Sequence, residues 1–182
     1  RFGFIPGILT GAYDAPSWAL SPYVLTILTS MFVHGSWSHI LGNMLFLWIF
    51  GNNVEDHLGH ASYLLFYLAG GVVAALVQLL SGPGSDVPTI GASGAIAAVM
   101  GAYFFVYPTA RVQVLVFFIF ITTIRLPAWI FLGVWFLMQL FEGTYGAAQG
   151  VAVWAHVGGF LFGLMIAWID RTRQRRRMDF TV

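Results

Sequence analysis

The sequence predicts an all-α polytopic membrane protein, and three observations support this prediction. Hydrophobic residues make up 59% of the 182 residues, charged residues make up only 8%, and the mean hydropathy is +0.82. A water-soluble domain of this length does not have such a composition. The apolar residues also fall into runs long enough to cross a bilayer, separated by turn residues. We therefore expect one helical bundle embedded in lipid.

Five runs are long enough to be transmembrane helices. A span needs about 17 to 25 helical residues to cross the hydrocarbon core. Cutting the chain at its turn residues gives candidate spans at residues 39–54, 62–80, 91–107, 126–141 and 151–169.

The remaining segments are expected to lie outside the spans. Residues 1–38 are interpreted as an outer interfacial loop and residues 170–182 as a basic cytoplasmic tail. Within the rest of the chain, the apolar stretches 22–33 and 112–124 are too short to cross, so we interpret them as interfacial or re-entrant. If residues 112–124 did cross, the assignment of span directions would have to be redone.

The charge pattern sets the expected topology. All eight basic residues are arginines, and five of them lie in the last dozen residues, while the net charge is only +1. This balance excludes nucleic-acid binding as the main function, and the arginine tail predicts a cytoplasmic C-terminus. We expect a bacterial or archaeal cell membrane with the active site toward the outer face. The absence of cysteine excludes a cysteine nucleophile.

This topology brings four polar residues to one end of the bundle. His39 and Asn43 begin the first span, Ser93 begins the third and His156 lies near the start of the fifth. Alternation gives these three spans the same direction, so the four residues share one depth. The same count puts the N-terminus outside, and the chain begins with Arg1, so we expect that an upstream span is missing from it.

Each of these residues has a simpler explanation when it is taken alone. Ser93 could cap a helix or allow close helix packing, Asn43 could bridge two helices, and His156 could be structural. Their shared depth favours an active site in which serine is the nucleophile and histidine the base. Asp14, Asp86 and Glu142 are assigned to outer loops, so we expect a Ser–His dyad without an orienting carboxylate.

The neighbouring glycines fit the same interpretation. Gly91 and Gly94 flank Ser93, so backbone amides at this helix start can approach a developing oxyanion. Gly159 and Gly163 form a small-residue ridge that can pack against a matching ridge after Ser93 and bring His156 within reach. His39 and Asn43 are four residues apart, so they share a helix face and could donate to the oxyanion; a hydrogen-bonded helix contact is the alternative.

Three other polar positions have weaker assignments. His34 is expected to brace the loop near the site. His57 and His60, with the neighbouring Glu55 and Asp56, could be imagined as a metal site, but a turn that caps two helices is favoured. We therefore expect neither a metal nor a cofactor.

These residues resemble the rhomboid intramembrane serine proteases over nearly the whole chain. The matching segments are Phe32-Val33-His34-Gly35-Ser36-Trp37-Ser38-His39-Ile40-Leu41-Gly42-Asn43, Phe50-Gly51-Asn52-Asn53-Val54-Glu55-Asp56, Gly91-Ala92-Ser93-Gly94-Ala95 and Ala155-His156-Val157-Gly158-Gly159-Phe160. The resemblance implies Ser93 as nucleophile and His156 as general base and then acid. It also implies His39, Asn43 and the Ser93 amide as oxyanion donors, and Glu55 as a structural residue at the cytoplasmic side.

The chain departs from this family in two respects. The family shares a core of six spans, so we expect that its first span is missing from this sequence. Some members carry an aromatic residue one turn after the nucleophile, stacked on the histidine, where this chain has Ala97.

The expected function is therefore an intramembrane serine endopeptidase. Its partners would be the lipid bilayer and the transmembrane segments of other membrane proteins, which must unwind locally before they are cut. We expect small or helix-weakening residues near the cleaved bond, and movement of residues 143–150 to admit the substrate. The alternative is a non-catalytic rhomboid-like protein that binds transmembrane clients.

Overall fold

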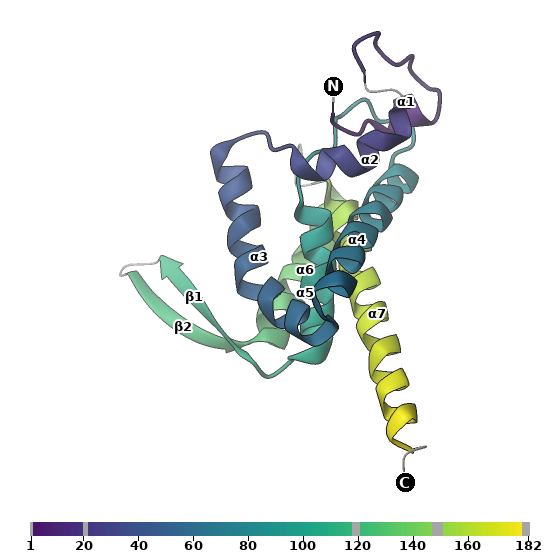
Figure 1. The fold of residues 1–182 in the computed structure, drawn as a ribbon. Helices are drawn as coiled ribbons and strands as arrows, with labels where there is room; N and C mark the ends of the chain where they lie inside the picture. Colours follow the sequence, from purple (N-terminus) through teal and green to yellow (C-terminus); the bar gives the residue numbers. More distant parts are fainter. Residues whose placement is uncertain (1, 20–21, 118–120, 147–150, 180–182) are drawn as a thin grey trace.

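The computed structural model describes residues 2–19, 22–117, 121–146 and 151–179 and shows a bundle of long helices. Figure 1 shows these helices side by side, with the C-terminal helix extending beyond the others at one end. The long helices are α3 (Trp37–Leu58), α4 (His60–Ser81), α5 (Ser93–Val106), α6 (Ala128–Tyr145) and α7 (Val153–Asp179).

Helix α5 is the centre of the bundle. Every residue from Gly94 to Tyr103 is buried, and α5 contacts α3, α4, α6 and α7. Its most extensive contact is with α7. Ser93 is the first residue of this helix and is partly buried, so it lies where the buried core begins.

Small residues allow α5 and α7 to approach closely. A Cβ atom at Gly159 would collide with the carbonyl oxygen of Gly94, and one at Gly163 would collide with that of Ala98. In the opposite direction, a Cβ atom at Gly101 would collide with the carbonyl oxygen of Phe160. The expected contact between two small-residue ridges is thus confirmed, and it brings the start of α7 against the start of α5.

The N-terminal region is more ordered than the expected loop. It contains α1 (Pro6–Leu9), the 3-10 helix η1 (Tyr23–Leu25), α2 (Thr26–Thr29) and the 3-10 helix η2 (Ser30–Phe32). Phe4 is fully buried with Ile27 and Ala75, and its backbone pairs with Thr89 just before the third expected span. The region therefore supports the chain that leads into Ser93. Its interfacial location stays a prediction.

The segment 112–124 contributes residues 112–117 and 121–124 to a pair of antiparallel strands, here called the hairpin, that the all-α prediction did not include. Strands β1 (Arg111–Phe117) and β2 (Ile121–Pro127) pair antiparallel, with Val112 opposite Leu126 and Val114 opposite Ile124. The hairpin extends away from the bundle on the side of α3 (Figure 1). Its alternating β-branched residues favour strands over a helix, although their apolar character suggested an interfacial segment.

By length and composition, α4 and the Val153–Thr172 part of α7 can each cross a membrane among the described residues. A third crossing arises if the segments Tyr23–Phe32 and Trp37–Leu58, which meet at an angle of 78°, count as one. Helix α5 is a shorter apolar helix. Polar residues lower the hydropathy of α3 and α6, so the expected number of five spans stays a prediction.

Helix bounds correct one further assignment. Helix α6 continues to Tyr145, about one turn past the expected end of the fourth span, so Glu142 lies in this helix and not in an outer loop. Of the residues expected to move for substrate entry, 143–146 belong to the end of α6 and its αL cap at Gly146, whereas 147–150 lie outside the described residues. In the expected tail, residues 180–182 also lie outside them.

Candidate active site

A cavity of about 420 Å³ lies where the first turns of α3, α5 and α7 meet α6. Four of the residues that the sequence singled out line it, namely His39, Asn43, Ser93 and His156. The rest of its wall is mainly apolar and comes from Phe46, Ile90, Ile96, Met100, Trp135, Val151 and Ala152, together with Ser38 and Gly42. A small polar cluster therefore faces an apolar cavity, as in many binding sites.

Ser93 and His156 are in direct hydrogen-bond contact. The Oγ atom of Ser93 lies 2.8 Å from Nε2 of His156, although the two residues are 63 positions apart in sequence. This distance lies in the range expected of a nucleophile and its base. The close packing of α5 on α7 produces it, because each residue lies in the first turn of its helix.

The start of α5 leaves its backbone donors available. No side chain caps this N-terminus, where Ala92 is the capping residue. The first N–H groups of a helix have no partner within the helix and attract negative charge. The amide of Ser93 is one of these groups, so a partial positive charge lies next to the nucleophile.

His39 and Asn43 lie opposite this helix start. The Nδ1 atom of His39 accepts a hydrogen bond from the backbone N–H of Gly35 at 3.4 Å, which leaves Nε2 as the protonated atom of the neutral ring. Asn43 is 7% exposed, and its Nδ2 group donates to the carbonyl oxygen of His39 at 3.1 Å. The amide nitrogen has a second hydrogen to donate.

Gly91 is required for this arrangement. Its φ angle is +109°, which side-chain-bearing residues rarely adopt. A Cβ atom there would lie 2.6 Å from Nε2 of His39. The backbone at residue 91 thus passes directly beside the imidazole, and its N–H donates to the carbonyl oxygen of Ser30 at 2.9 Å. Gly94 serves packing instead, because a Cβ atom there would lie 2.6 Å from that of Ala74 on α4.

Gln139, which was not expected from the sequence, contacts His156 from α6. Its Oε1 atom lies 2.6 Å from Nδ1 of His156, and its side chain is buried. The Nε2 group of Gln139 donates to Oε2 of Glu142 at 3.3 Å, one turn further along the same helix. A polar residue inside the apolar segment 126–141 is itself the signal that could have found it, because such residues are costly in lipid and usually face a site.

Trp135 was also missed. Its ring centroid lies 5.9 Å from that of His156, with an angle of 38° between the planes. It precedes Gln139 by four residues, so both side chains lie on one face of α6. An aromatic contact to the histidine therefore comes from α6, whereas position 97 on α5, where some rhomboid proteases have their aromatic residue, holds a buried alanine.

The remaining four expected supporting residues do not line the cavity. His34 packs edge-on against His39, with ring centroids 5.0 Å apart, and burial lowers its pKa, with His39 lowering it further. Glu55 lies in the last turn of α3, where its Oε1 atom contacts Nδ1 of His60 at 2.7 Å. Gly159 and Gly163 belong to the interface between α5 and α7.

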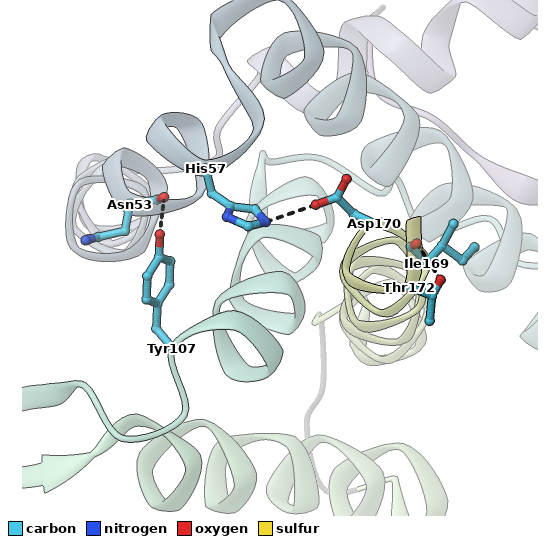
Figure 2. Close-up of polar contacts among 6 residues, drawn as sticks. All are labelled: Asn53, His57, Tyr107, Ile169, Asp170 and Thr172. Atoms are coloured by element: carbon cyan, nitrogen blue, oxygen red, sulfur yellow. Dashed lines mark hydrogen bonds and ion pairs between the residues drawn. The ribbon is translucent and has the colours of Figure 1, made fainter. Parts of the chain in front are cut away.

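The two histidines that were considered as metal ligands belong to two separate residue pairs. Figure 2 shows His57 directed toward Asp170 of α7, and Nε2 of His57 lies 3.1 Å from Oδ2 of Asp170. His60 instead contacts Glu55. Near the first pair, the hydroxyl of Tyr107 donates to the carbonyl oxygen of Asn53 at 3.1 Å (Figure 2). These contacts join the ends of α3, α5 and α7 that lie opposite the cavity.

The chain is similar to rhomboid-named proteins, three of which are described here. The chain is 28% identical to Rhomboid protein 1, mitochondrial, of Saccharomyces cerevisiae over 167 residues, covering 84% of this chain and 45% of the yeast protein. It is 31% identical to the human Presenilin-associated rhomboid-like protein, mitochondrial, over 144 residues, covering 76% of this chain and 36% of the human protein. A third relative, Rhomboid-like protein 11, chloroplastic, of Arabidopsis thaliana, is 38% identical over 84 residues, covering 46% of this chain and 28% of that protein.

These relatives correct one expectation and establish the family. The expected bacterial or archaeal cell membrane is contradicted, because the relatives are mitochondrial and chloroplastic proteins by name. The cytoplasmic C-terminus and the outward-facing active site, which were assigned for such a membrane, are contradicted as well. The chain spans less than half the length of these relatives. The Rhomboid domain family model matches residues 21–173, which include the whole cavity, and the chain therefore belongs to the rhomboid family.

Proposed function

We propose that this protein is an intramembrane serine endopeptidase that hydrolyses peptide bonds in or next to transmembrane segments of other membrane proteins. The observation that carries the proposal is the 2.8 Å contact between Ser93 Oγ and His156 Nε2 at the wall of a cavity that His39 and Asn43 also line. The names of the yeast and human relatives support a mitochondrial membrane as its location.

In the proposed reaction, Ser93 Oγ attacks the carbonyl carbon of the scissile bond while its proton passes to Nε2 of His156. The carbonyl oxygen becomes an oxyanion, which accepts hydrogen bonds from Nε2–H of His39, Nδ2–H of Asn43 and the amide of Ser93. The imidazolium then protonates the leaving amine, and the C–N bond breaks. A water molecule, deprotonated by His156, hydrolyses the resulting ester and releases Ser93.

The nature of the site limits the substrate. A transmembrane helix hides its carbonyl groups in internal hydrogen bonds, so it must unwind before Ser93 reaches one. Glycine and other helix-weakening residues lower that cost by about 1 kcal/mol each relative to alanine. Segments that contain such residues near the cleaved bond are therefore the proposed substrates, and replacing these residues with leucine should slow cleavage.

The competing proposal is a rhomboid-like protein that binds transmembrane clients without cutting them. It needs the fold and the cavity but not a hydrogen bond between serine and histidine. Cleavage of a tagged single-span reporter in liposomes, measured beside reporter binding, separates the two. Ser93→Ala and His156→Ala should each lower kcat by about 10³-fold or more while binding persists. Ser62→Ala, which changes an exposed serine on α4, is the matched control. Binding without cleavage by the unaltered protein would favour the client-binding proposal.

A further inference from the structure

Helix α6 supplies a polar chain to the side of His156 that faces away from Ser93. The chain runs from Oε2 of Glu142 to the amide of Gln139, with 3.3 Å between the bonded atoms, and from Oε1 of Gln139 to Nδ1 of His156 at 2.6 Å. Gln139 is 7% exposed, so water does not readily replace its contact with the imidazole. Both residues lie on a helix that the sequence analysis connected with no catalytic role.

The direction of these hydrogen bonds follows from which atoms can donate. The carboxylate of Glu142 only accepts, so it takes a hydrogen from the amide nitrogen of Gln139 and thereby fixes which way the amide points. The amide oxygen then faces His156 and only accepts as well. Nδ1 of His156 must therefore carry the proton, which leaves Nε2 unprotonated toward Ser93.

We propose that Gln139 is a positioning residue that holds His156 in the tautomer and orientation needed to accept the proton of Ser93, and that Glu142 orients Gln139. This inference rests on the proposed protease function. In a triad, a carboxylate that contacts the histidine directly has this role. Here a neutral amide makes the contact, and the carboxylate lies one residue further along the chain of hydrogen bonds.

The arrangement suits an apolar site. A carboxylate placed directly against His156 would be buried within the bundle, where an unpaired charge is costly whenever the histidine is neutral. The amide of Gln139 carries no charge, and Glu142 lies about one turn nearer the end of α6, where it is only partly buried. The base is thus oriented without a full charge beside it.

Trp135 restricts the imidazole from the same helix face. Its ring lies against that of His156, so the ring has one wall at Trp135 and a hydrogen-bond anchor at Gln139. Both contacts come from α6, and the position of this helix therefore determines whether His156 faces Ser93. Removing the anchor should lower the rate of the chemical step without changing how the substrate binds.

The test combines kinetics with a measurement that does not depend on activity. Gln139→Leu should lower kcat about tenfold to hundredfold with little change in KM, because it removes the acceptor but keeps the side-chain volume. Nitrogen NMR of the side chain of His156 should show one tautomer, protonated at Nδ1, in the unaltered protein and a mixture in Gln139→Leu. Met138→Ala, which truncates an exposed side chain next to Gln139 on α6, is the matched control and should change neither quantity.

An exchange of the two side chains tests the direction of the chain and guards against misfolding. Gln139→Glu combined with Glu142→Gln keeps both hydrogen bonds but places the carboxylate against His156. This pair should recover much of the kcat lost in Gln139→Leu. The pH at which activity falls on acidification should also move upward, because a direct carboxylate stabilises the protonated imidazole.

Two results would overturn the inference. One is an unchanged kcat in Gln139→Leu, and the other is a His156 ring that is protonated at Nε2 in the unaltered protein. If the unaltered protein cuts no reporter but its His156 is protonated at Nδ1 and loses this preference in Gln139→Leu, the contact is supported and the protease proposal fails. The two proposals are therefore tested separately.

Discussion

The backbone of Gly91 lies so close to His39 that any β-carbon at position 91 would be 2.6 Å from the imidazole Nε2 atom. The φ angle of +109° at this residue adds a second reason why glycine is needed. This contact links the loop before α5 to the first turn of α3. Glycine at position 91 thus allows the two sides of the proposed oxyanion site to lie this close together.

Gly91→Ala should therefore reduce activity while the bundle remains folded. The unfavourable backbone conformation costs about 1–3 kcal/mol, and the displaced imidazole of His39 would no longer face the oxyanion. We expect kcat/KM to fall by about tenfold to hundredfold in the reporter assay. Gly84→Ala is the matched control, because a Cβ atom there meets no other atom within 4 Å. Equal activity of both variants would contradict this role of Gly91.

Asn43→Ala tests the oxyanion donors directly. Loss of one preorganised donor typically lowers kcat by about 10²–10³-fold, and KM should change little because the donor acts mainly on the transition state. Steady-state kinetics on the reporter measure both constants. Asn53→Ala, an exposed asparagine on the same helix, should behave like the unaltered protein. A rise in KM alone in Asn43→Ala would assign Asn43 to substrate binding instead.

Gly163→Ala should destabilise the bundle. Its added methyl group would collide with the carbonyl oxygen of Ala98, and backbone atoms in a packed interface cannot move aside cheaply. Overpacking of this kind costs about 1–3 kcal/mol. Thermal unfolding in detergent measures the effect. Gly133→Ala on α6 is the control, since the nearest atom to its added methyl group is 3.8 Å away. A midpoint for Gly163→Ala as high as that of the control would contradict the proposed packing.

The contact between His57 and Asp170 should matter far less. Their side chains are 24% and 32% exposed, so solvent screens the pair, and we expect His57→Leu to lower stability by less than about 1 kcal/mol. The kcat of the folded fraction should not change, because the pair lies at the end opposite the cavity. Unfolding curves and reporter kinetics on one preparation measure both. A loss of kcat in this variant would mean that the two ends are coupled.

The helical bundle could be predicted from the sequence because its apolar segments are separated by turn residues, while the number of spans stays a prediction. The small-residue ridge at Gly159 and Gly163 also predicted the close packing of α7 on α5. The strands at residues 111–117 and 121–127 were missed because a short apolar run with β-branched residues looks the same whether it lies at an interface or forms strands. The pairing of β1 with β2 can be seen only in the structure.

Local sequence patterns also determined which residues of the site could be predicted. Ser93 and His156 stand beside glycines at helix starts, so their meeting could be inferred from pattern and parity, while their catalytic roles stay predictions. Gln139 lies within an apolar run and has no accompanying motif. Glu142 was placed in a loop because the end of α6 could not be located from hydropathy alone. The contacts of Gln139 with His156 and of Glu142 with Gln139 depend on how α6 is rotated about its axis. A local sequence pattern does not predict this rotation.

The proposed function depends above all on Ser93 being a nucleophile that His156 activates. The most direct measurement is covalent labelling of the folded protein in liposomes with a fluorophosphonate, followed by mass spectrometry of its peptides. We expect an adduct on Ser93, formed far more slowly in His156→Ala and absent after heat unfolding. An unlabelled Ser93 in the folded protein, or equal labelling rates with and without His156, would contradict it.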